Sequence, residues 1–216
     1  MERVAWYPYL ALGLGLITGR FLNVIIHRYC QCAFAVRYPL SELLTGAAFL
    51  VLGYLYSPDF TVLQLFFLAC FFCLLYTLAV IDITVFLLPD RLVYLLLWLG
   101  LAASVLNIIP VSPRDSVTGA ILIWIGTWLI AQGHIWICKR EGLGNGDVKL
   151  YAACAAWLGI DYVTELMLGS AVLGILAFTL RGLLRFRRLA MVDPYMPFGP
   201  AIALAALFIL HIEVLR

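Results

Sequence analysis

Eight apolar segments, separated by short polar breaks, constrain the fold of this chain more than any other feature of its sequence. A helix needs about 20 mostly apolar residues to cross a bilayer, and most of these segments reach or approach that length. The chain is 65% hydrophobic and 12% charged. Soluble domains are about 45–50% apolar and about 25% charged, so a soluble core cannot absorb this much apolar surface. We therefore predict an all-α, polytopic bundle of about eight transmembrane helices with no soluble domain.

The breaks between the segments are rich in Pro, Ser and Asp, as at Ser57-Pro58-Asp59 and Leu88-Pro89-Asp90. No internal repeat is visible, so we expect one membrane-embedded domain over residues 1–216. No small-residue cleavage site follows the first segment, which predicts a retained span and not a removed signal peptide. The expected spans are Ala5–Tyr29, Leu40–Tyr56, Phe60–Asp82, Arg91–Ile109, Ser116–Cys138, Asp147–Gly159, Tyr162–Leu184 and Pro197–Leu215.

The basic residues are distributed unequally between the two sides of this predicted bundle. If the spans alternate in direction, the ends and loops after the first, third, fifth and seventh spans carry ten of the 14 Lys and Arg residues. The other side carries Arg3, Arg114 and Arg216, and Arg20 lies within the first span. Because basic loops stay in the cytoplasm, we expect both termini outside and the ten basic residues at the cytoplasmic face.

A glycine-rich turn, Gly142-Leu143-Gly144-Asn145-Gly146-Asp147, interrupts this apolar sequence. Gly and Asn adopt positive φ at low cost, so the backbone is expected to bend sharply here. The turn delivers Asp147 to the start of the short sixth span, which we expect to begin inside the bundle. Asp147 could act only as the N-cap of that helix, because Asp is a preferred N-cap residue.

A second aspartate, Asp82, lies in another apolar segment, with no basic residue nearer than Arg91. Charged residues within spans are costly and usually functional, although Asp82 could also be a boundary residue in contact with lipid headgroups. Asp82 ends the third span and Asp147 begins the sixth, so the expected topology brings both to the cytoplasmic face. Two carboxyl groups held close together share a proton, and one pKa rises above the other. One can then activate water while the other polarises a peptide carbonyl, which predicts aspartic peptide hydrolysis without metal or cofactor.

The two aspartates and their neighbours resemble a known family. Asp82 followed by six residues and Pro89-Asp90, together with Gly144-Asn145-Gly146-Asp147, resembles the type IV prepilin peptidases, GxGD-type aspartic proteases of bacterial inner membranes. By this resemblance Asp82 and Asp147 are the catalytic aspartates, and Gly144, Gly146 and Lys149 support the catalytic loop. Three further stretches resemble the family's first span and the starts of its second and last spans, namely Gly19–Arg28, Arg37–Gly46 and Pro197–Pro200.

The resemblance also implies a substrate. The family removes a short basic leader from prepilins or pseudopilins, after a glycine and just ahead of a hydrophobic helix. It implies a role in type IV pilus assembly or type II secretion, and an active site facing the cytoplasm. The expected partners are therefore a prepilin or pseudopilin precursor and membrane lipid, with no nucleic acid and no cofactor.

Four polar residues near the expected site have alternative interpretations. Asp90 either caps the fourth span or binds basic residues of the leader. Glu42 lies near a helix start or belongs to a polar cluster, and Asn23 either lines a cavity or lies at the membrane interface. We regard these three residues as candidates for substrate contact. Lys149 could bias Asp147 toward its ionised form or extend to the lipid headgroups.

The chain departs from the family after its first span. Full-length members usually carry a long cytoplasmic loop with two Cys-x-x-Cys pairs that bind zinc. Here about ten residues separate Tyr29 from Pro39 and hold only Cys30-Gln31-Cys32, fewer than the four ligands of a structural zinc site. We expect no metal site, and interpret Cys70 and Cys73 as packing residues within a span. Because the long-loop members are usually bifunctional, the short loop also predicts weak or absent N-methyltransferase activity.

A second class of function remains open from the sequence. Acidic residues within spans also carry protons or bind ions in transporters and non-enzymatic assembly subunits. Transporters often contain an internal repeat, and this chain shows none, which favours the peptidase.

Overall fold

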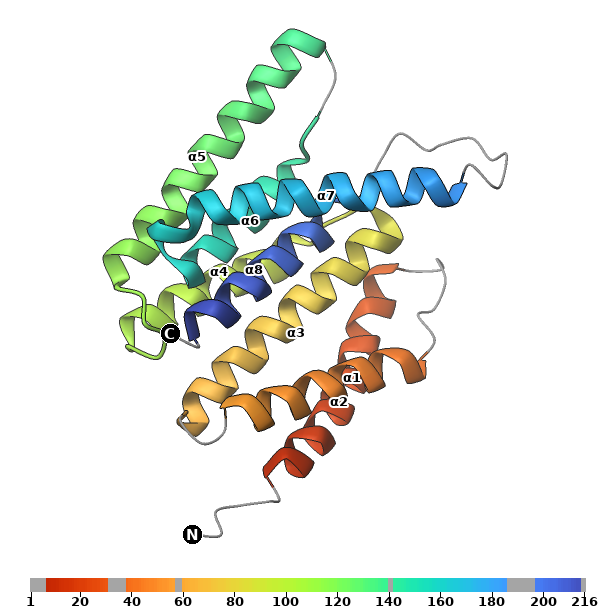
Figure 1. Ribbon diagram of the computed structural model, residues 1–216, viewed down its shortest axis with the longest axis vertical. Coiled ribbons are helices and arrows are strands. Elements are labelled where there is room, and N and C mark those ends of the chain that lie inside the picture. Colours follow the sequence, from red (N-terminus) through yellow and green to blue (C-terminus); the bar gives the residue numbers. More distant parts are fainter. Residues whose placement is uncertain (1–6, 31–37, 57–59, 140–141, 186–196, 215–216) are drawn as a thin grey trace. The chain divides into compact units, whose positions relative to one another are not determined.

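The computed structural model describes residues 7–30, 38–56, 60–139, 142–185 and 197–214. These ranges form α-helices without a strand, which confirms the predicted all-α class (Figure 1). Several residues discussed above lie outside the described residues, namely Arg3, Cys32, Arg37 and Arg216. The helices are α1 (Tyr7–Cys30), α2 (Tyr38–Tyr56), α3 (Val62–Val85), α4 (Asp90–Val105), α5 (Pro113–Cys138), α6 (Asn145–Leu158), α7 (Val163–Arg185) and α8 (Gly199–Val214), with a 3-10 turn, η1 (Ile160–Tyr162), before α7.

Each predicted apolar segment corresponds to one helix of the described chain. Among the residues that the structure describes, four helical segments are long and apolar enough to cross a membrane, namely Tyr9–Cys30, Val62–Val85, Pro113–Cys138 and Ile160–Leu183. Shorter apolar helical segments are Ser41–Val51 and Gly199–Glu213. With 14 residues, α6 is shorter than the roughly 20 residues that a bilayer requires.

The chain divides into two compact units, Met1–Val85 and Phe86–Arg216. The first contains α1 to α3, and the second contains α4 to α8. The expectation of one membrane-embedded domain over residues 1–216 stays a prediction.

In the first unit, α1 and α2 pack closely because small residues face each other. A Cβ atom at Gly15 would lie 2.7 Å from the carbonyl oxygen of Thr45, and one at Gly19 would meet the Thr45 side chain. The Thr45 hydroxyl donates a hydrogen bond of 2.9 Å to the Gly15 carbonyl. Small residues spaced four apart allow helix backbones to approach in this way, as in many membrane proteins.

The second unit is built around α6, which contacts α4, α5, α7 and α8 (Figure 1). Every residue of α6 from Leu150 to Leu158 is buried. The Trp157 indole donates a hydrogen bond of 2.9 Å to the Leu96 carbonyl of α4, and the Ser116 hydroxyl of α5 bonds to the Ala156 carbonyl. Protein therefore surrounds α6 along most of its length, so this helix can be both short and apolar on all sides.

Candidate active site

Asp82 lies in the last turn of α3, and only 6% of its surface is exposed. The last turn of α1 lies beside this end of α3, because Cys30 Sγ is 2.9 Å from Thr84 Oγ1. Within the first unit, the C-terminal ends of α1 and α3 therefore meet, as the alternating topology predicts. Burying a carboxyl group at the end of an apolar helix is costly. The burial of Asp82 therefore argues against the alternative that it is only a boundary residue in contact with lipid headgroups.

The other two candidate residues of the first unit are Asn23 of α1 and Glu42 of α2. Asn23 is buried, whereas His27 and Arg28, one turn further along α1, are exposed. Burial of Asn23 is compatible with the cavity-lining interpretation, and its place relative to the membrane interface stays a prediction. Glu42 is half-buried at the start of α2, and a Cβ atom at Gly19 would lie 2.8 Å from its Cα.

Asp147 is the third residue of α6 and is half-buried. Gly144 is the N-cap of this helix, and no side chain forms a cap hydrogen bond. The interpretation of Asp147 as the N-cap is therefore wrong. The Asp147 amide donates to the Gly144 carbonyl at 3.0 Å, and a Cβ atom at Gly144 would lie 3.1 Å from Asp147 Oδ2. The absence of a side chain at Gly144 thus leaves room for the carboxyl group.

The glycines of this turn are needed for close packing and not for positive φ. In the described residues Gly159 is the glycine with positive φ, and Gly144 has φ of −67°. The left-handed residue near the turn is instead Lys139, with φ of 57°, which ends α5. A Cβ atom at Gly146 would lie 3.1 Å from Leu88 Cβ, so the turn packs against the segment that contains Pro89. The expectation that these glycines bend the chain through positive φ is therefore wrong.

Lys149 and Asp90 join the starts of α6 and α4 through an ion pair of 2.7 Å. The ammonium group also lies 5.7 Å from the centre of the Tyr94 ring. Asp90 is the first residue of α4, whose N-cap is Pro89 without a side-chain cap hydrogen bond, so the cap interpretation of Asp90 is wrong. The Asp90 side chain is 55% exposed and the Lys149 side chain is 31% exposed. Because exposed ion pairs are weak, this pair contributes at most about 1 kcal/mol to the stability of the fold. The pair shows that the starts of α4 and α6 lie side by side.

Tyr151 lies one turn after Asp147, on the same face of α6. Its buried hydroxyl group forms a hydrogen bond with Ser170 of α7, and its ring lies 6.4 Å from that of Phe198, just before α8. The turn that carries Asp147 is therefore fixed to α7 and α8 as well as to α4. Tyr151 could not be predicted as a supporting residue, because an aromatic residue in an apolar helix gives no signal of a polar partner 19 residues away.

The cysteines give no sign of a metal centre in the described part of the chain. Within these residues, no three His, Cys, Asp or Glu side chains come together as possible ligands. Cys30, Cys70, Cys73, Cys138 and Cys154 are free thiols. Cys70 and Cys73 are half-buried in α3, consistent with packing residues. The expected absence of a metal stays a prediction.

The model of the type IV leader peptidase family matches residues 67–179, just over half of the chain. This range includes Asp82, Asp90, Asp147 and Lys149. No solved structure matches the chain significantly.

Three curated relatives carry the name prepilin leader peptidase/N-methyltransferase. The protein of Pectobacterium carotovorum subsp. carotovorum is 37% identical over 84% of this chain and 62% of its own length. The protein of Dickeya chrysanthemi is 38% identical over 86% of this chain and 63% of its own length. The protein of Neisseria gonorrhoeae is 33% identical over 82% of this chain and 58% of its own length.

The chain thus spans about three fifths of the length of the curated relatives that it matches. Its long apolar helices and these relatives identify an integral membrane protein. The matched residues and the identities establish its relationship: the chain belongs to the type IV leader peptidase family.

Proposed function

We propose that this protein is a membrane aspartic endopeptidase that removes the basic leader from type IV prepilins or secretion-system pseudopilins. The observation that carries this proposal is the glycine-rich turn that begins α6 with Asp147, in a family member that also buries Asp82 at the end of α3. The relatives' names support the same reaction and the same substrate class. The peptide bond is hydrolysed without a covalent intermediate, by water and two carboxyl groups.

The two aspartates have different surroundings, which suggest different roles. Asp147 lies in the first turn of α6, where the helix dipole and the free backbone N–H groups stabilise a carboxylate. Asp82 is buried in the last turn of α3, where the dipole disfavours negative charge. We assign Asp147 as the base that accepts a proton from water. Asp82 is the acid that donates to the carbonyl oxygen as the water oxygen attacks the carbonyl carbon.

The supporting residues then have defined tasks. Gly144 leaves space for the Asp147 carboxyl group, Gly146 lets the turn approach Leu88, and Lys149 holds the turn to α4. Asp90 is the more exposed partner of that ion pair, so a basic residue of the leader can bind it in place of Lys149. Glu42 and Asn23 are proposed as further contacts for the substrate, from the first unit.

The expected location of this reaction is the cytoplasmic face of the bacterial inner membrane. A leader that has not crossed the membrane is accessible only from that side. The unequal distribution of Lys and Arg supports this orientation.

We also propose that the protein has weak or absent N-methyltransferase activity. A methyl-transfer site must enclose its donor and hold the substrate amine in line with the methyl group. The ten or so residues between Tyr29 and Pro39 are too few to build such a pocket alone. Mass spectrometry of pilin matured by this enzyme alone should show a free N-terminal amine. An N-methylated terminus would show that the methylation site lies elsewhere in the chain.

Cleavage of a purified prepilin by the protein in liposomes tests the peptidase proposal. We expect leader removal in the presence of EDTA, because the two carboxyl groups supply both acid and base. Loss of cleavage with EDTA and its recovery with zinc would assign the chemistry to a metal. A protein that moves protons or ions across the liposome membrane and leaves prepilin uncut would instead be the transporter of the alternative hypothesis.

A further inference from the structure

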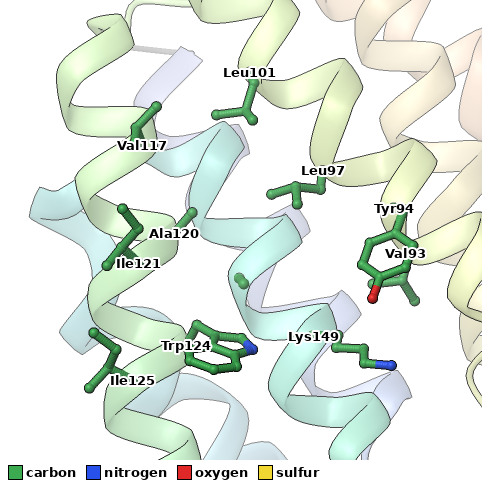
Figure 2. A pocket seen from close by; sticks show the side chains of 11 residues that line it. Val93, Tyr94, Leu97, Leu101, Val117, Ala120, Ile121, Trp124, Ile125 and Lys149 are labelled. Carbon is green, nitrogen blue, oxygen red and sulfur yellow. The ribbon is translucent and has the colours of Figure 1, made fainter.

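An apolar groove of about 550 Å³ opens between α4 and α5, with α6 as its floor. Leu97 and Leu101 of α4 form one wall, and Val117 and Ile121 of α5 form the other (Figure 2). The floor consists of small side chains, Ala120 of α5 and Ala152 of α6. All of these residues belong to the second unit.

The polar groups of the groove lie at one end. Figure 2 shows Lys149 and Trp124 at that end, and Leu101 and Val117 at the other. Tyr94 also lines the groove, beside Lys149. The Lys149 ammonium has three N–H donors, and its partners are Asp90, at 2.7 Å, and the Tyr94 side chain. One N–H donor therefore remains for a further acceptor at the mouth of the groove.

The length of the groove suits an acyl chain. From Val93 to Leu101 the groove follows α4 for about 12 Å, at about 1.5 Å per residue. An extended hydrocarbon chain can therefore lie along this apolar wall for about two helical turns.

We propose that this groove binds a membrane phospholipid, with one acyl chain along the Leu97–Leu101 wall and the phosphate at Lys149. The charge of the Lys149 ammonium complements a phosphate. Tyr94 and Trp124 lie at the same end, and Tyr and Trp side chains prefer the level of the lipid headgroups. The groove thus matches an amphiphile, polar at one end and apolar over the following two helical turns.

Asp147, the proposed catalytic residue of α6, does not line the groove. Residues two positions apart on a helix point to opposite sides, so Lys149 faces away from Asp147. A lipid bound at Lys149 therefore lies on the other side of α6 from Asp147, and it leaves Asp90 open to a basic residue of the leader. The inference goes beyond the proposed function and does not depend on it.

The test uses the full chain in liposomes with a phospholipid that carries a photoreactive diazirine in its acyl chain. After irradiation, mass spectrometry locates the lipid adducts on α5. Ile121 lines the groove, whereas Leu122, its neighbour, is equally exposed but does not line it. We expect adducts on Ile121 about tenfold above those on Leu122, the ratio that a difference of 1.4 kcal/mol in affinity gives. Equal labelling of the two residues would show ordinary boundary lipid and would overturn the proposal.

Two pairs of variants sharpen the result. Val117→Trp fills the groove and should abolish the preference for Ile121, whereas Leu122→Trp, on the other side of α5, should preserve it. Lys149→Gln should reduce labelling by the phospholipid and leave labelling by a diazirine-bearing diacylglycerol, which lacks the phosphate, unchanged. Retained labelling in Val117→Trp would contradict the acyl-chain site, and equal loss of both probes in Lys149→Gln would contradict the phosphate contact.

Discussion

At the scale of single residues, the glycines before Asp147 act through the space that they leave empty. A side chain at Gly146 would press on Leu88, and one at Gly144 would approach the Asp147 carboxyl group. The sequence identified these positions correctly but gave the wrong reason, because a glycine-rich turn has the same appearance whether it supplies positive φ or close packing. At Gly146 the close packing is against Leu88, which is almost 60 positions away in the sequence.

The contact between Gly146 and Leu88 gives a prediction for stability and activity. Gly146→Ala places a methyl group about 3.1 Å from Leu88 Cβ, and overpacking of this kind costs about 1–3 kcal/mol. We expect a lower thermal midpoint and weaker prepilin cleavage. The double variant Gly146→Ala/Leu88→Ala should recover part of both, because it removes the opposing side chain. If Leu88→Ala adds to the loss instead, the two residues do not meet as described.

The pair of Lys149 and Asp90 marks the limit of sequence reasoning at this scale. The two residues are 59 positions apart, and each alone is an ordinary charged residue at a helix start. Asp82 and Asp147 were identifiable because charge within an apolar segment is rare. The pairing of Lys149 with Asp90 depends on how α4 and α6 pack, and the sequence around either residue does not indicate it.

At the scale of the elements, α6 is the helix around which the second unit is organised. Its length and apolar character follow from the sequence, since an apolar run that is too short for a bilayer must be buried by protein. Some helix starts were likewise predictable, because Pro89 and Pro113 stand where α4 and α5 begin. The end of the fourth span was predicted wrongly, since α4 ends at Val105 and not at Ile109, and Asn107 just beyond it has φ of 53°. The choice of neighbours for α6 was not predictable, since its buried alanines could face any helix.

The hydrogen bond from Trp157 to the Leu96 carbonyl is expected to anchor α6 on α4. Trp157→Phe keeps an aromatic ring but removes the hydrogen bond to this carbonyl, whose net contribution is about 0.5–1.5 kcal/mol. The thermal midpoint of the protein in detergent should fall accordingly. Trp98→Phe provides the control, because Trp98 is exposed on α4 and should change stability little. An equal effect of both substitutions would argue against this anchor.

At the scale of the whole molecule, the alternation of the helices predicts how the chain crosses the membrane. Within the second unit the starts of α4 and α6 lie together, as expected for spans that enter from the same side. The distribution of basic residues assigns that side to the cytoplasm.

Reporter fusions test this orientation. A reporter that is active only outside the cytoplasm should be silent when fused near Gly142 and active when fused near Ser112. The reverse pattern would place the glycine-rich turn on the side that an untranslocated leader cannot reach.

The central claim is that Asp82 and Asp147 together perform the cleavage, and one measurement tests it most directly. Asp82→Asn and Asp147→Asn each keep size and polarity but remove the titratable group. The cleavage rate of prepilin in liposomes should fall by at least about 10²–10⁴-fold in each, the contribution expected of an acid or base catalyst. Asp161→Asn, in the exposed η1 turn, is the matched control and should cleave normally. Cleavage at the wild-type rate by either of the first two variants, at equal protein levels in the membrane, would contradict the account.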